Sequence, residues 1–225
     1  MPLARSAEAV AGEGPPRAAT VRRSRSPRGQ GEQLREEILL AAERLLIETN
    51  DESALSIRAI ANAVGVTPPS IYLHFSDRND LVFAVCERQA KEIDMVMERA
   101  AAEGSDPWDR VRRRGLAYLR WGLANPEHYR ILMMSRPDAT PERFVDQRLS
   151  DATGLEAVAS DIVLAAEAGI IEAVADPLRE AELFWIIIHG MVSMLVAKPE
   201  FPFGAPDDLF DAMFDLVQRG LIPRS

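Results

Sequence analysis

Three histidines and one cysteine are the residues of this chain best suited to metal binding or nucleophilic catalysis. His74, His128 and His189 are scattered along the sequence and lack the ligand spacing of a zinc site. The chain has no glycine-rich phosphate loop and no nucleophile elbow. Cys86 has no second cysteine to pair with, which favours a reducing compartment. We therefore expect no catalytic residues, no metal and no cofactor. The sequence disfavours an enzymatic function.

Composition indicates a soluble helical protein. The 225 residues are 47% hydrophobic and 27% charged, as in ordinary globular domains, and the 6% of aromatic residues is low for an all-β chain. The most hydrophobic stretch, 183–197, is shorter than the roughly 20 residues of a membrane-spanning helix. No apolar signal segment follows the first arginines. We predict a cytoplasmic protein without a membrane partner, in which 183–197 forms a buried helix.

Taken alone, the net charge of −9 argues against binding to nucleic acid, because neutralisation of phosphates supplies most non-specific affinity. The charge is unevenly distributed, however, since acidic residues gather toward the C-terminal end. Residues 1–31 are rich in proline, glycine, serine and arginine, and we expect a disordered basic arm. The arm contributes to DNA binding or is merely a solvated leader, and the sequence does not decide between these alternatives.

Periodicity and capping residues predict four helices in the first half of the chain. The first runs from about Glu32 to Thr49. Ser56 is a good N-cap for a short second helix that stops at Gly65. A third helix is expected from Pro68 to about Phe75, because proline is tolerated at the first helical position. A fourth follows a cap at Ser76 or Asp77 and extends toward Ala102.

A capping residue followed by proline recurs beyond residue 104 and predicts further helix starts. These pairs are Asp106-Pro107, Asn125-Pro126, Thr140-Pro141, Asp176-Pro177 and Ala205-Pro206. Another helix is expected at 155–168, ending at Gly169. No segment alternates with the period of a strand. The prediction is an all-α fold with a three-helix helix-turn-helix domain at 32–77 and a larger helical domain at 78–225.

The segment from Ser56 to Phe75 has the composition of a helix-turn-helix. This motif needs small residues where its helices cross, a turn glycine and apolar anchors. The residues that meet these needs are Ala59, Ala61, Ala63, Gly65, Ile60, Val66, Ile71 and Phe75. The second helix of such a motif lies in the major groove with its N-terminal residues toward the base edges.

This segment closely resembles the DNA-binding domain of TetR-family regulators. The resemblance covers about residues 32–85, and the matching residues are Ala61, Gly65, Val66, Thr67, Ile71, Tyr72, His74, Phe75, Arg78, Asp80 and Leu81. One departure is Arg78, where the family usually has lysine, but either cation can bind a phosphate. The resemblance implies a homodimer on an inverted-repeat operator in double-stranded DNA.

The resemblance also assigns roles to single residues. It implies that Tyr72, His74, Arg78 and the helix start at Ser56 contact phosphates. The residues implied to face bases are Thr67, Pro68, Pro69, Ser70 and Leu73, which offer van der Waals contact rather than bidentate hydrogen bonds. The alternatives are a packing role for Tyr72, a solvent-facing position for His74 and a plain surface charge for Arg78.

Phe184 to Met194 resembles a Trp-x-x-x-His-Gly signature found in one group of TetR C-terminal domains. The family implies that the helices at about 177–197 and 206–220 form a four-helix bundle with a partner subunit. The predicted interface residues are Trp185, His189, Gly190, Phe210 and Phe214. The alternative is that this apolar surface is an intrachain core.

An effector pocket is expected among the helices at 108–124, 126–134 and 155–168. Aromatic rings and flexible thioethers suit a tolerant apolar site for a mostly apolar small molecule. The candidate lining residues are Trp121, His128, Tyr129, Met133 and Met134, although apolar stripes are more often ordinary core. The predicted function is a repressor released from its operator by this effector, and the main alternative is a DNA-binding factor without an effector.

Overall fold

The computed structural model describes residues 30–49, 55–134 and 154–221, and within these ranges all regular structure is helical. The N-terminal helices are α1 Gln30–Thr49, α2 Ile57–Val64, α3 Pro68–Ile71 and α4 Arg78–Ala102. The C-terminal helices are α5 Pro107–Ala124, α6 Pro126–Met134, α8 Leu155–Glu167, α9 Pro177–Ala197 and α10 Pro206–Leu221. The predicted all-α fold is thus confirmed. The basic arm and the predicted helix start at Thr140-Pro141 lie outside the described residues.

Local capping explains several helix starts. The side chains of Asp77, Asp106 and Asp176 accept hydrogen bonds from the backbone N–H three residues later, which satisfies one orphan donor in each helix. The helices that begin at Pro107, Pro126, Pro177 and Pro206 confirm the expected cap-then-proline starts. The third helix is shorter than predicted, because residues 72–74 form a turn before α4.

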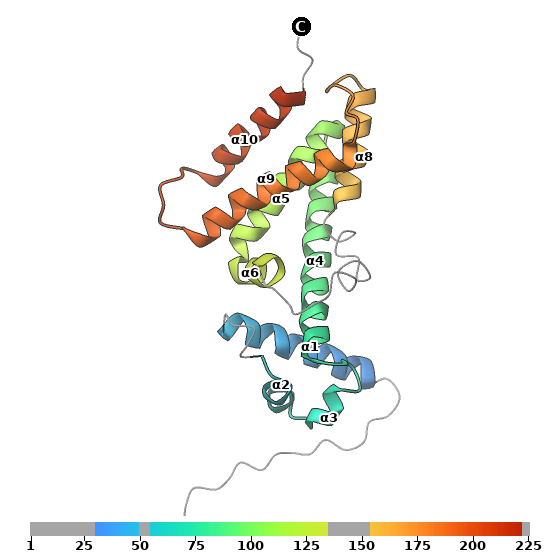
Figure 1. Ribbon diagram of the computed structural model, residues 1–225, viewed down its shortest axis with the longest axis vertical. Coiled ribbons are helices and arrows are strands. Elements are labelled where there is room, and N and C mark those ends of the chain that lie inside the picture. The colour runs from blue at the N-terminus through green and yellow to red at the C-terminus, as the bar shows by residue number, and fades with distance from the viewer. Residues whose placement is uncertain (1–29, 50–54, 135–153, 222–225) are drawn as a thin grey trace, which may run out of the picture.

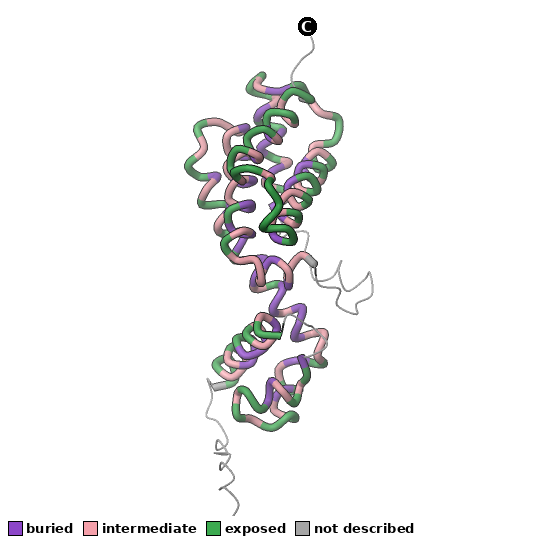
Figure 2. Tube along the Cα trace, turned by 90° about the vertical axis from the view of Figure 1, so that its left-hand side faces the viewer, coloured by how far each residue is buried: buried purple, intermediate pink, exposed green. Residues whose placement is uncertain are grey.

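The helices form two hydrophobic cores that share α4. Figure 1 shows α1, α2 and α3 clustered at one end of the molecule, with α4 rising from them into the larger group of helices. In Figure 2 the buried residues line the inside of both groups. The first core includes Ile38, Ile60 and Ile71 together with Leu81 and Val85 from the start of α4. α4 therefore belongs to both cores, and the expected domain boundary of 77/78 stays a prediction.

The second core is built on α5, which packs between α4, α8 and α9 (Figure 1). Gly115 and Gly122 allow this approach, since a Cβ at Gly115 would lie 2.8 Å from both Phe184 and Ile188. α9 is long and apolar enough to cross a membrane, but the core helices of soluble proteins can have the same length and composition. One of its faces, including Ala181, packs in this core. The predicted burial of this helix is therefore correct for one face.

Candidate DNA-binding and regulatory sites

The turn between α2 and α3 has the geometry of a helix-turn-helix. The hydroxyl of Ser56 accepts a hydrogen bond from the N–H of Ala59 at 3.1 Å and fixes the start of α2. Gly65 ends α2 with φ at +76°, a left-handed conformation that glycine adopts without a Cβ clash. The buried side chains of Ile60 and Ile71 hold the two helices together. The exposed side of α3 is left free to meet a ligand.

Most of the predicted base-contacting residues are exposed. Thr67, Pro68 and Pro69 are exposed, and Leu73 is 83% exposed, which is unusual for a large apolar side chain. The hydroxyls of Thr67 and half-buried Ser70 lie 3.0 Å apart and bind each other. All five residues thus lie in or beside α3, and their role as base contacts stays a prediction.

The predicted phosphate-contacting residues lie at the start of α2 and between the end of α3 and the start of α4. Tyr72 is 55% exposed, whereas its neighbour Ile71 is buried. Ser56 is exposed, and His74 and Arg78 are half-buried. Arg78 is the first residue of α4, after the cap at Asp77. The contact of these residues with phosphates stays a prediction.

A polar contact joins the helix-turn-helix to the rest of the protein. Glu43 of α1 is 12% exposed at its side chain, and its Oε1 lies 3.0 Å from Nε2 of His128 on α6. The amide of Gln89 on α4 donates to the same carboxylate, and Arg88 pairs with Glu36. His128 therefore contacts the DNA-binding end of the molecule instead of lining a described cavity.

Tyr129 lies in a buried polar cluster between α5, α6 and α9. Its hydroxyl is 2.7 Å from Nδ1 of His189 and can donate to the His189 carbonyl oxygen at 3.1 Å. The Tyr118 hydroxyl lies 3.2 Å from the same nitrogen. Burial raises the pKa of Tyr129 to about 12, raises the pKa of Tyr118 further and lowers that of His189. The three side chains are therefore neutral near pH 7 and form a hydrogen-bonded core.

The remaining predicted effector residues are dispersed. Met133 is half-buried against the second core, and the side chain of Met134 lies outside the described residues. Trp121 is buried, and its indole N–H has no hydrogen-bond partner among the described residues. Trp121 lines a groove of about 430 Å³ along the seam of α4 and α5. Of the five predicted residues, only Trp121 borders a groove described here.

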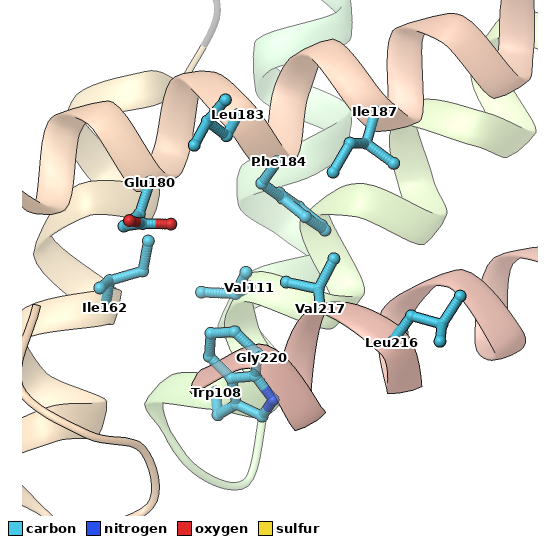
Figure 3. A pocket seen from close by; sticks show the side chains of 10 residues that line it. All are labelled: Trp108, Val111, Ile162, Glu180, Leu183, Phe184, Ile187, Leu216, Val217 and Gly220. Carbon is cyan, nitrogen blue, oxygen red and sulfur yellow. The ribbon is translucent and has the colours of Figure 1, made fainter. Parts of the chain in front are cut away.

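A second groove of about 290 Å³ lies among α5, α8, α9 and α10. Figure 3 shows apolar side chains around most of it, with Trp108 and Val111 on α5 and Val217 on α10. Its outer residues Ile187 and Leu216 are 45% and 67% exposed. This groove therefore opens onto the apolar outer surface of the last two helices.

The predicted interface residues divide into two groups. Gly190 is exposed, and a Cβ added there would meet no described atom of the same chain within 4 Å. Trp185 is half-buried and stacks on His189 with ring centroids 5.5 Å apart. Phe210 and Phe214 are instead 0% and 3% exposed and pack in the second core. These two side chains are thus occupied within the chain, which corresponds to the alternative of an intrachain core.

A buried ion-pair cluster joins α4, α5 and α8, and sequence reasoning missed it. Asp161 on α8 is 5% exposed and pairs with Arg110 and Arg114 of α5. Two nitrogens of Arg114 donate to Glu98 of α4, each at 3.0 Å. Burial disfavours the charge on Arg114, but the bonds to Glu98 and the attraction of Glu98 and Asp161 outweigh it and raise its pKa. A sequence signal existed, since Asp161 lies in the stripe of Val158 and Ala165.

Among the described residues, no group of three histidine, cysteine or acidic side chains is placed to hold a metal ion. The expected absence of metal and cofactor stays a prediction.

Two family models match the chain, one in each half. The model of bacterial regulatory proteins of the tetR family matches residues 38–85, which include the helix-turn-helix. A model described as the tetracyclin repressor-like C-terminal domain matches residues 111–217. A comparison with curated proteins found no significant match.

Similar solved structures span nearly the full length of their chains. A protein of unknown function from Rhodococcus sp. RHA1 is 27% identical with a TM-score of 0.69, and the match covers 84% of this chain and 96% of that one. A TetR family transcription regulator from Marinobacter aquaeolei VT8 is 21% identical with a TM-score of 0.64, covering 88% and 100%. A tetR family regulatory protein from Rhodococcus RHA1 is 18% identical with a TM-score of 0.64, covering 86% and 99%.

Proposed function

Because the chain belongs to the TetR family of bacterial regulatory proteins, we propose that it is a cytoplasmic repressor released from its operator by a small-molecule effector. DNA binding and transcription regulation are the functions of this family, and no catalytic role is part of the proposal. The observation that carries it is the exposed surface of α3, flanked by Tyr72 and Arg78. Two such surfaces in a homodimer would meet the two halves of an inverted repeat.

The phosphate contacts provide the first test. Arg78→Ala is expected to weaken binding to all duplex sequences alike, because phosphate contacts position the protein without distinguishing bases. The slope of log affinity against log salt should become shallower by about one unit for each half-site. Tyr72→Phe should also lower affinity for all sequences alike, since it removes a hydroxyl and keeps the ring. Fluorescence anisotropy at several salt concentrations measures both effects.

The matched control is Arg99→Ala, which removes an exposed arginine from the far end of α4. This variant should retain the salt dependence of the unmodified protein. A folded Arg78→Ala protein with an unchanged slope would remove Arg78 from the backbone contacts.

The outer face of α9 supports the proposed homodimer. Its exposed apolar side chains recur with helical spacing at Leu183, Ile186, Ile187 and Met194, with Gly190 among them. Together with Leu216 of α10 they form one apolar surface, which we call the α9 face. An exposed apolar patch of this kind marks an interaction surface. In the proposed dimer a second copy covers it, including the mouth of the groove in Figure 3.

The α4–α5 groove is the described cavity best placed to couple an effector to DNA. Its lining combines Val96 and Ala100 of α4 with Leu116, Ala117 and Trp121 of α5, and the charged side chains of Arg113 and Arg120 also border it. A mostly apolar ligand that separates these helices would tilt α4, which carries the DNA-binding core. The contact of His128 with Glu43 would shift with it, and the spacing of the two α3 helices would change.

The proposed release mechanism requires reciprocal coupling. A thermal-shift screen of small apolar molecules would identify an effector, because a ligand stabilises the state that it binds. The effector should lower operator affinity about 5–150-fold, and saturating operator should weaken effector binding by the same factor in calorimetry. Equal effector affinity with and without operator would refute release. A failed screen would favour the alternative of a factor without an effector.

A filling substitution tests the location of the site. Ala117→Leu should reduce effector affinity by occupying the groove beside Trp121, while operator binding without effector stays nearly unchanged. Ala102→Leu is the matched control on the exposed end of α4, outside the groove. Equal effector affinity in both variants would place the effector elsewhere.

A further inference from the structure

The base-facing surface of α3 is apolar to an unusual degree. Leu73 is 83% exposed, and Pro68 and Pro69 are exposed beside it. Packing within the chain does not account for a leucine in this position. Its exposure leaves the isobutyl group available to a partner surface that is itself partly apolar.

The same surface is poor in hydrogen-bonding groups. Between Val66 and Phe75 the sequence has no arginine, lysine, asparagine or glutamine, the residues that make bidentate contacts with guanine and adenine. The hydroxyls of Thr67 and Ser70 bind each other at 3.0 Å. Pro68 and Pro69 also lack backbone N–H groups, so the start of α3 offers fewer main-chain donors than a typical helix.

The polar side chains that follow α3 lie at its far end. His74 is half-buried, and its ring lies beside the first turn of α1, where its Cε1 would be 3.9 Å from a Cβ at Gly31. Tyr72 carries one hydroxyl on an exposed ring. Neither residue supplies the bidentate hydrogen bonds that identify a purine in the major groove.

The major groove offers one apolar feature that a protein can recognise, the 5-methyl group of thymine. We propose that Leu73 and Pro69 select the operator by contact with 5-methyl groups of pyrimidines, so that the bases under α3 are thymines. This inference rests on the proposed DNA-binding function and names the chemistry of that site. A 5-methylcytosine places the same methyl group in the groove, so it should substitute for thymine.

The experiment begins with a random-sequence duplex library, from which the full-length protein selects its preferred half-sites. The recovered duplex is resynthesised with deoxyuridine at one thymine at a time, which removes one methyl group and keeps the base pair. At the thymines under α3 we expect affinity to fall about fourfold, the effect of one buried methyl-sized group. A 5-methylcytosine·guanine pair at those positions should retain affinity, whereas an unmethylated cytosine·guanine pair should lose it.

Protein variants assign the effect to the side chain. Leu73→Ala should bind the thymine and deoxyuridine duplexes equally, because this variant has already lost the contact with the methyl group. The substitution should leave the fold intact, because Leu73 is exposed. Leu40→Ala, which truncates a leucine 48% exposed on α1, is the matched control and should retain the fourfold difference. Replacing purines with their 7-deaza forms should change affinity little, since few donors face the N7 atoms.

Two results would overturn the inference while leaving DNA binding intact. One is a selected site in which deoxyuridine changes affinity less than twofold at every thymine. The other is Leu73→Ala retaining full sensitivity to the methyl group. A protein that selects and retains no duplex would overturn both this inference and the proposed function.

Discussion

Asp161→Ala is expected to lower the free energy of unfolding by about 3 kcal/mol, at the low end of the range for breaking a buried ion pair. The substitution removes the carboxylate that pairs with Arg110 and Arg114. Arg114 is 6% exposed, so its charge would stay in the interior without full compensation. The loss stays at the low end because Glu98 still accepts two hydrogen bonds from Arg114.

Thermal unfolding followed by circular dichroism measures this effect. A loss of about 3 kcal/mol corresponds to a fall in Tm of about 6–12 °C for a protein of this size. The control Glu182→Ala breaks the exposed pair with Arg179, which should cost at most about 1 kcal/mol. The double variant Arg114→Met with Asp161→Ala should recover part of the lost stability, because no unpaired buried charge remains.

Two results would contradict a stabilising role for this cluster. In one, Asp161→Ala unfolds within about 1 kcal/mol of the unmodified protein, as an exposed pair would. In the other, the double variant is less stable than Asp161→Ala alone, which would indicate that Arg114 contributes through packing of its stem rather than through its charge.

The helix-turn-helix could be predicted from sequence because its determinants are local. Each of three residues acts on the backbone next to it. Ser56 is the N-cap of α2, Gly65 ends that helix in the left-handed conformation, and Pro68 is the first residue of α3. The all-α fold follows from the same kind of signal. The turn after α3 was not predicted, because residues 71–75 have apolar helical spacing while the chain must bend toward the cap at Asp77.

The effector residues could not be placed from sequence, because periodicity does not state what a helix face packs against. Tyr129 lies on an apolar face, as expected, but its hydroxyl meets His189, 60 residues away in the chain. Asp161 and Arg114 are 47 residues apart. Apolar spacing on α10 also does not distinguish the two sides of that helix, of which Phe210 lies on the inner and Leu216 on the outer. Such pairings are fixed by tertiary packing alone.

Gly190→Leu is expected to separate the proposed homodimer and to weaken operator binding about 10²–10⁴-fold, because linked subunits bind two half-sites far more tightly than separate ones. Gly190 lies in the middle of the α9 face, where glycine permits the close approach of a second helix. Within one chain the added side chain meets open space, since no described atom lies within 4 Å of its Cβ. The monomer should therefore stay folded, and the change should affect assembly.

Sedimentation velocity gives the oligomeric state, and anisotropy with full-site and half-site duplexes gives the affinities. The half-site duplex should bind Gly190→Leu as well as it binds a single unmodified subunit, because Leu73 and Arg78 are untouched. Ala102→Leu, the same side chain on an exposed part of α4, should leave both the dimer and full-site affinity unchanged. A Gly190→Leu protein that sediments as a normal dimer would exclude a tight helix crossing at Gly190 and move the interface to another surface. Loss of half-site affinity as well would instead indicate damage to the fold, since separation of the subunits leaves each α3 intact.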